Sequence, residues 1–271
     1  MRRPVRLGAV DYLNVRPLVD GLDRHPEQVS LRFDVPSVCA ALLSAGDIDL
    51  GMVPSITLLE RPGDCVVPGV CIGSDGPVAS VALFARCPIR DVRSIALDTS
   101  SRTSVTLTRI LCARRFEIAP DFVPHPPDLG AMLVRADAAL LIGDPALFAG
   151  DAARGTEKID LGAEWTAMTG LPFVWAFWAG RAGAADAGIV ALLQDAAEQG
   201  MSRTDEVAAG YCAGHPNRIA LAQRYLRENL VFRLSGRALA GLQTYYQEAA
   251  ALGLTGPPGE IEFFPQPVRV A

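Results

Sequence analysis

One strand–turn–helix pattern occurs twice in this chain, and this repetition constrains the fold more than any other feature. Each copy starts with an apolar strand and continues through a polar turn into a helical stretch. A second strand, headed by an aspartate, comes later in each copy. The first copy has its elements at residues 5–10, 11–14, 16–22 and 47–53, and the second at 94–97, 98–104, 105–115 and 137–142. Alternating strands and helices are typical of parallel sheets, so the sequence predicts an α/β fold with two lobes.

Polar residues follow the strands at the same point in both copies. Open α/β sheets bind ligands beside the carboxyl ends of their strands. Two further strands, at residues 78–85 and 172–179, frame the second copy and predict two parallel crossings that act as a hinge. We therefore expect lobe one to comprise residues 1–86 and 177–271, lobe two to comprise residues 87–176, and a ligand cleft to lie between them. Later helical patterns, at 219–230 and 238–252, predict helices packed outside a sheet.

The composition argues against several classes of function. The formal net charge is −5 and no basic stripe occurs, so we expect no nucleic-acid partner. No run approaches about 18 apolar residues and no leader pattern is evident, so we expect a cytoplasmic protein without a membrane partner. The six cysteines show no CxxC spacing, and each of the three histidines precedes a proline. We therefore expect reduced core thiols and no metal, and the lack of a glycine-rich phosphate motif predicts no cofactor. The sequence predicts no particular oligomeric state.

The polar turn of the second copy is unusually rich in hydrogen-bonding groups. It holds five hydroxyl side chains and one guanidinium: Thr99, Ser100, Ser101, Arg102, Thr103 and Ser104. Backbone N–H groups at a helix start, hydroxyl donors and an arginine together suit a carboxylate or a phosphate. Serine and threonine are also favoured simply as helix caps. The number of hydroxyls favours the anion site.

Other candidate residues are weaker when taken alone. Asn14 could donate to a ligand oxygen and accept from a hydroxyl, but asparagine is also a common turn residue. Ser55 and Ser80 carry little information in isolation. Gly143 and Asp144 follow the last strand of the second copy, and Asp144 could be a base, a hydrogen-bond acceptor or only part of a turn.

Several of these segments together resemble a known family, the chorismate dehydratases of the futalosine route to menaquinone. Residues 11–18 (DYLNVRPL) resemble its YLNxxPL signature. The other matching segments are residues 46–55, 97–104, 141–144, 160–165 and 169–174, so the resemblance extends from about residue 5 to 180. Arg16 departs from the family, which often has an apolar residue there, and Pro145 occupies a position at which relatives vary.

The resemblance implies a bilobed fold like that of type II periplasmic binding proteins, used here by an intracellular enzyme. It implies that chorismate, a small-molecule substrate, loses water to give 3-[(1-carboxyvinyl)oxy]benzoate without a cofactor. It also implies a catalytic role for Asn14. The substrate-binding residues implied are Ser55, Ser80, Thr99, Ser100, Ser101, Arg102, Thr103, Ser104, Gly143 and Asp144.

The identity of the base stays open between two hypotheses. In the first, the enolpyruvyl carboxylate of the substrate takes the C3 proton while Asn14 orients it or the departing hydroxyl. In the second, Asp144 or Asp11 is an ordinary general base. Rival functions are a non-catalytic solute-binding protein for a small carboxylate, a ligand-binding regulator, and the 1,4-dihydroxy-6-naphthoate synthase of the same route. Fold alone does not separate the binding protein from the enzyme.

Overall fold

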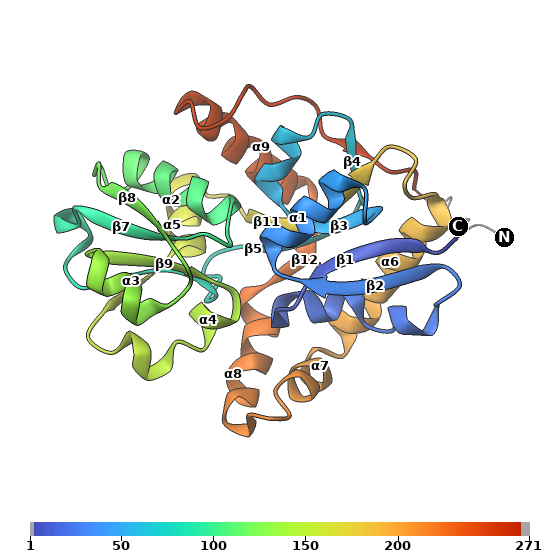
Figure 1. Ribbon diagram of the computed structural model, residues 1–271, viewed down its shortest axis with the longest axis horizontal. Coiled ribbons are helices and arrows are strands. Elements are labelled where there is room, and N and C mark those ends of the chain that lie inside the picture. Colours follow the sequence, from blue (N-terminus) through green and yellow to red (C-terminus); the bar gives the residue numbers. More distant parts are fainter. Residues whose placement is uncertain (1–2, 267–271) are drawn as a thin grey trace. The chain divides into compact units, whose positions relative to one another are not determined.

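The computed structural model describes residues 3–266, without the side chains of Pro36 and Ser37. The described chain forms two compact units, each built around one sheet (Figure 1). The first unit contains residues 3–73, Val174–Gly236 and residues 259–266. The second contains Ser74–Phe173 and Arg237–Pro258. The mixture of strands and helices confirms the predicted α/β class.

The sheet of the first unit has the strand order β12-β5-β11-β3-β1-β2, with β4 paired to β11 and to β13. The strands are β1 (Val5–Val10), β2 (Val29–Asp34), β3 (Leu50–Pro54), β4 (Asp64–Val66), β5 (Val70–Ser74), β11 (Phe173–Arg181), β12 (Val231–Arg233) and β13 (Glu262–Phe263). Strand β1 pairs in parallel with β2 and with β3. The carboxyl ends of β1 and β3 therefore meet at one edge, where the 11–14 turn and Ser55 follow them.

The helices of the first unit are α1 (Pro36–Ala45), α6 (Ala187–Ser202), α7 (Thr204–Tyr211) and α8 (Ile219–Arg224), which continues as a π-helical turn, Tyr225–Asn229. Short 3₁₀ segments, η2 (Leu22–Arg24), η3 (Ser55–Glu60) and η6 (Pro216–Arg218), connect other elements of this unit.

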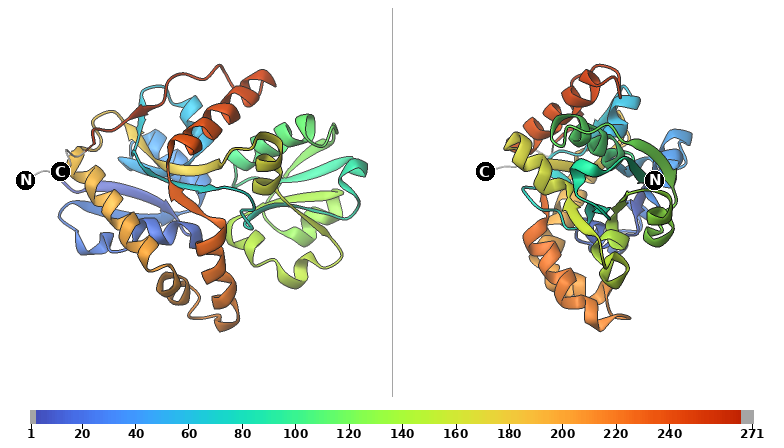
Figure 2. Two further views of the ribbon diagram at one scale, coloured as in Figure 1. Left: turned by 180° about the vertical axis from the view of Figure 1, so that it is seen from behind. Right: turned by 90° about the vertical axis from the view of Figure 1, so that its left-hand side faces the viewer.

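The helical stretch expected at residues 16–22 is a 3₁₀ helix, η1 (Leu13–Val19). Pro17 lies inside it and has no N–H to donate, which disfavours a regular α-helix at this point. Helix α6 lies directly against η1 (Figure 2). At Gly200 of α6 the two backbones are so close that a Cβ atom would lie 2.0 Å from the Pro17 carbonyl oxygen.

The sheet of the second unit has the order β10-β6-β9-β7-β8. Its strands are β6 (Val81–Ala85), β7 (Ser94–Asp98), β8 (Asp121–His125), β9 (Ala138–Ile142) and β10 (Glu157–Asp160). Strand β7 pairs in parallel with β8 and β9, whereas β6 is antiparallel to β9 and to β10. Alternate residues of these strands, such as Phe84 and Leu141, share a buried apolar cluster with Met132 and Ala146 from helices on one face.

Helices cover both faces of the second sheet, with α2 and α5 on one side and α3 on the other (Figure 1). The helices are α2 (Thr103–Arg114), α3 (Leu129–Arg135), α4 (Gly143–Leu147), α5 (Leu161–Thr169) and α9 (Gly236–Ala251), with short 3₁₀ segments η4 (Ile89–Asp91) and η5 (Gly150–Ala153). Tyr245 of α9 is fully buried, packs edge-on against Phe173 at 4.8 Å between ring centroids, and donates a hydrogen bond to the Thr103 carbonyl at 2.9 Å. These contacts fix α9 in the second unit.

The units differ from the predicted lobe boundaries in two places. The prediction assigned residues 78–85 and the C-terminal helix to lobe one, but β6 pairs within the second sheet and α9 belongs to the second unit. The chain passes between the units after Gly73, Phe173, Gly236 and Pro258, which is more often than the predicted pair of crossings. The hinge and the ligand cleft stay predictions.

Candidate functional site

The predicted ligand-binding residues of the second unit lie along one edge of its sheet. Parallel neighbours β7 and β9 end at Asp98 and Ile142, and the antiparallel β6 places Val81 opposite Ile142. The segments that carry the candidates therefore come together: Ser80, residues 99–104, Gly143 and Asp144. We call this set the hydroxyl edge. Its position at the carboxyl ends of parallel strands is the place where open α/β sheets bind ligands.

Several groups in the 99–104 turn are occupied by the turn itself. Ser100 donates both its backbone N–H (2.8 Å) and its hydroxyl (2.6 Å) to the Asp98 carboxylate. The Ser101 hydroxyl accepts the Ser104 N–H at 3.2 Å, so it caps the first turn of α2. Ser101 and Ser104 are buried, whereas Thr99 and Arg102 are exposed. The helix-cap interpretation therefore holds for Ser101, and the ligand-loop interpretation stays a prediction for the exposed Thr99 and Arg102.

Asp98 was not among the predicted site residues, although it begins the 98–104 turn. Its side chain is completely buried, and its Oδ2 atom has no hydrogen-bond partner within the described part of the chain. Burial raises the pKa of the Asp98 carboxyl, and the hydrogen bonds from Ser100 oppose this rise. An acid at the end of an otherwise apolar strand is the sequence signal that could have identified it.

Gly143 and Asp144 open the short helix α4. Gly143 has φ +62°, a conformation that glycine adopts at little cost. The side chain of Asp144 is half-buried, and its carbonyl accepts the Phe148 N–H at 2.9 Å. Ser80 at the start of β6 is 1% exposed. The strand pairing therefore positions both segments beside the 99–104 turn.

In the first unit, Asn14 and Ser55 follow the neighbouring strands β1 and β3. The Asn14 Oδ1 atom is buried without a hydrogen-bond partner among residues 3–266, so this residue retains an unused acceptor. The Ser55 hydroxyl donates to the Val174 carbonyl at 2.8 Å from a fully buried position. That hydroxyl ties the start of η3 to β11. The two predicted residues thus lie at one edge of the first sheet but differ in what their side chains can offer a ligand.

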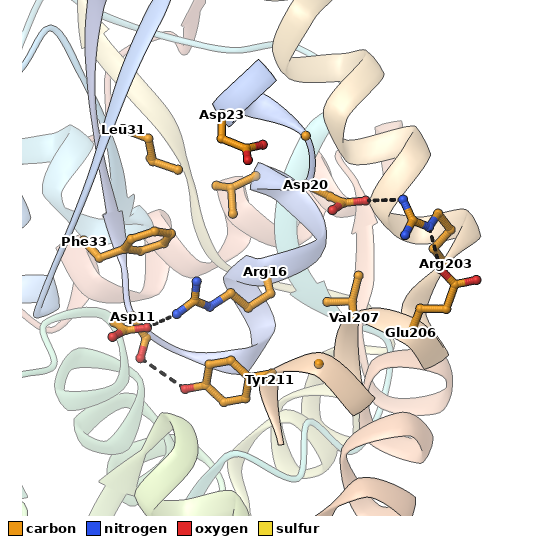
Figure 3. A pocket seen from close by; sticks show the side chains of 13 residues that line it. Asp11, Arg16, Asp20, Asp23, Leu31, Phe33, Arg203, Glu206, Val207 and Tyr211 are labelled. Atoms are coloured by element: carbon orange, nitrogen blue, oxygen red, sulfur yellow. Dashed lines mark hydrogen bonds and ion pairs between the residues drawn. The ribbon is translucent and has the colours of Figure 1, made fainter. Parts of the chain in front are cut away.

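A groove of about 740 Å³ lies beside Asn14's segment within the first unit (Figure 3). The Arg16 guanidinium forms an ion pair with Asp11 in this groove. It also stacks against two aromatic rings, with 4.4 Å to the centroid of Phe33 and 5.1 Å to that of Tyr211. These cation–π contacts explain how Arg16 is accommodated at a position where we expected the family to have an apolar residue. Asp11, one of the candidate bases, is therefore paired with the Arg16 guanidinium.

Within residues 3–266, no group of three or more histidine, cysteine, aspartate or glutamate side chains is arranged to hold a metal ion. No helix in this part of the chain is long and apolar enough to span a bilayer. All of the six cysteines except Cys87 are buried, as expected for core thiols, and none of the six forms a disulfide.

Comparison of the sequence with known proteins finds relatives that match over nearly the whole chain. A family model described as menaquinone biosynthesis matches residues 5–251. A chorismate dehydratase from Thermus thermophilus is 31% identical over 284 residues, which cover 97% of this chain and 100% of that protein.

Comparison with solved structures defines the fold. Protein AF1704 from Archaeoglobus fulgidus superimposes with a TM-score of 0.76 at 16% identity, covering 93% of this chain and 98% of that one. The periplasmic aliphatic sulphonate binding protein SsuA from Escherichia coli gives 0.65 at 18% identity, covering 100% and 97%. The Candida albicans CA3427 product, described as having the generic periplasmic binding protein fold, gives 0.68 at 10% identity, covering 95% and 92%. The predicted periplasmic-binding-protein-like fold is thereby confirmed.

Proposed function

The chain belongs to the menaquinone biosynthesis family, and from this premise we propose that it is a hydro-lyase that removes water from chorismate to give 3-[(1-carboxyvinyl)oxy]benzoate. The observation that carries the proposal is the 31% identity to a chorismate dehydratase over the full length of that protein. The hydroxyl edge supports it, because chorismate has two carboxylates and this edge combines an arginine, hydroxyls and the start of a twelve-residue helix.

We expect the reaction to need few acid–base groups from the protein. Loss of the C3 hydrogen and the C4 hydroxyl makes the ring aromatic, so the products are strongly favoured. The enzyme must hold the ring in an eliminating conformation and stabilise charge, and both can be supplied by fixed hydrogen-bond donors. Exposed Thr99 and Arg102 are the groups of the 99–104 turn that we propose meet a substrate carboxylate.

Asn14 is the proposed catalytic residue in the first unit. Its unpaired Oδ1 can accept a hydrogen bond from the substrate, while its amide N–H groups can donate to a carboxylate. An asparagine cannot take a proton at neutral pH, so the C3 proton must go elsewhere. The enolpyruvyl carboxylate of the substrate is our proposed acceptor. The ion pair with Arg16 argues against Asp11 as the base, and Asp144 is the remaining alternative.

The first test is incubation of the purified protein with chorismate and resolution of the products by mass. A product lighter by one water, with the ultraviolet absorption of a substituted benzoate, is expected. Unchanged chorismate that raises the melting temperature would instead indicate a solute-binding protein. No reaction and no stabilisation would refute chorismate as the ligand, and turnover of a cyclic futalosine-derived compound would indicate the naphthoate synthase.

The base is tested with Asp144→Asn and Asp11→Asn, using the exposed surface substitution Asp151→Asn as the control. Substrate assistance predicts that both variants retain the chemical step. Loss of single-turnover product formation with chorismate binding intact, in either variant but not in the control, would overturn it. We also propose a cytoplasmic location, since six cysteines that form no disulfide suit a reducing compartment. Thiol labelling in intact cells and after lysis tests this.

A further inference from the structure

The turn that precedes strand β6 has an uncommon backbone conformation. Ala79 has φ +62°, and among the described residues only Glu117 shares a positive φ without being glycine. The Ser80 N–H donates to the Val78 carbonyl at 2.8 Å, which closes a three-residue turn around Ala79. Such conformations persist where surrounding contacts enforce them. The contacts that hold residues 78–80 therefore determine where Ser80 lies.

Two side chains of strand β10 satisfy the remaining backbone groups of this turn. The Asp160 carboxylate accepts the Val78 N–H at 2.9 Å and the Ala79 N–H at 2.6 Å. The Lys158 ammonium group donates to the Ala79 carbonyl at 2.6 Å. Lys158 and Asp160 are two positions apart on one strand, so their side chains leave the same face of the sheet.

Each of these side chains also binds a second element. Asp160 accepts the N–H groups of Gly162 and Ala163, each at 3.0 Å, and so caps helix α5. Lys158 reaches the Ala146 carbonyl of α4 at 3.4 Å. A single ammonium group thus links the turn before Ser80 to the helix that begins with Gly143 and Asp144.

The chemistry of the ammonium group suits this place. Lys158 is the single lysine of a chain whose other 24 basic side chains are arginines. A compact ammonium can donate to two carbonyls that lie in different directions, whereas a guanidinium donates from a rigid planar fork. Partial burial lowers the pKa of Lys158, as expected for an ammonium packed against backbone and 5.7 Å from the Phe84 ring centroid.

We infer that Lys158 and Asp160 are positioning residues, which hold the Ser80 turn against helix α4 so that the hydroxyl edge is preformed for its ligand. The inference rests on the proposed function for the identity of that ligand, chorismate. Neither residue has to touch the substrate. Their effect passes through the backbone of residues 78–80 and through Ala146.

The test uses Lys158→Met, which keeps the length of the side chain and removes its charge. We expect the Ala79 and Ser80 amides to exchange with solvent at least about tenfold faster, and kcat/KM for chorismate to fall by a similar factor. The matched control is Glu157→Gln, an exposed residue on the opposite face of the same strand, with both quantities unchanged. Lys158→Arg should restore part of the loss.

A double-mutant cycle with Ser80→Ala separates positioning from general stability. If Lys158 acts through the turn, Lys158→Met costs much less in kcat/KM when Ser80 is already alanine. Equal costs in both backgrounds, or wild-type amide exchange in Lys158→Met, would overturn the inference. If Lys158→Met does not fold, Lys158→Arg and Asp160→Asn are measured in the same cycle. If the wild-type protein does not convert chorismate, the proposed function fails, but the amide exchange still decides whether Lys158 holds the turn.

Discussion

The contact between helix α6 and the 3₁₀ helix η1 makes a sharp prediction about Gly200. Substitution by alanine would place a Cβ atom 2.0 Å from the Pro17 carbonyl oxygen and 2.6 Å from its carbonyl carbon. Real Cβ atoms essentially never approach within 3.0 Å, so the two helices must separate by about 1 Å. Both partners at this contact are backbone, which no side-chain rotation can relieve.

The expected size of the effect follows from two opposing terms. Replacing a glycine by alanine in a helix interior gains about 1 kcal/mol of helix propensity, and this is the upper limit for Gly200, which lies in the last turn of α6. Forcing extra volume into a packed contact costs about 1–3 kcal/mol, and the upper part of this range applies because neither backbone can yield locally. We therefore expect Gly200→Ala to lower the free energy of unfolding by about 1–2 kcal/mol. Since η1 carries Asn14, turnover of chorismate should fall as well.

Urea denaturation at neutral pH, followed by circular dichroism, measures this change. Gly210→Ala in helix α7 is the matched control, because a Cβ atom there would meet nothing within 4 Å. It should be neutral or stabilise by up to about 1 kcal/mol through propensity alone. A Gly200→Ala protein as stable as Gly210→Ala would refute the argument that backbone contact fixes η1.

Three further substitutions test the electrostatics and the core. The folded-state pKa of Asp98 is raised, so its negative charge opposes folding increasingly as the pH rises above about 4. The stability of Asp98→Asn should therefore increase relative to that of the wild type between about pH 4 and 7. A difference in urea midpoint that does not change with pH would contradict this prediction. Hydrogen bonds from Arg3 and Arg6 hold the pKa of Asp49 well below its usual range, so the stabilisation of the fold by this carboxylate is present above about pH 4 and is lost as the pH falls further. Asp49→Asn should therefore be less stable than the wild type at neutral pH, and the difference in free energy of unfolding should shrink as the pH is lowered. Tyr245→Phe removes the hydrogen bond to the buried Thr103 carbonyl and should cost about 0.5–1.5 kcal/mol in thermal or urea unfolding, whereas an unchanged midpoint would show that this bond makes no net contribution to stability.

Local patterns in the sequence predicted the strands β1, β3, β6, β7, β9 and β11, and the place where polar residues gather. Apolar strands followed by hydroxyls or acids are readable because strand period and turn chemistry are local properties. The assignment of α9 to the second unit was not readable, since the helical pattern around Tyr245 shows which face is apolar but not which sheet it covers. Likewise, Pro17 alone does not indicate a 3₁₀ helix, because a proline is equally compatible with the first turn of an α-helix.

In the candidate site, too, local features were predictable from the sequence and tertiary contacts were not. The hydroxyls singled out the 99–104 turn and the family resemblance implied Ser80, but nothing in the sequence connected Ser80 with Lys158. The two are far apart in the chain and meet only through sheet pairing. Nor could composition show that the Ser100 hydroxyl donates a hydrogen bond to the Asp98 carboxylate. The roles of the site residues toward a substrate stay predictions.

The way in which α9 completes the second unit also bears on how the protein is made. Residues 74–173 leave the ribosome well before α9, so their aromatic core lacks Tyr245 until Arg237–Pro258 has followed. The intervening Val174–Gly236 belongs to the first unit, so the second unit cannot finish folding before nearly all of its neighbour has been synthesised. During that interval Trp165 and Phe173 lack their ring contacts with Tyr245. We therefore expect a fragment that ends before α9 to expose part of this apolar core and to aggregate.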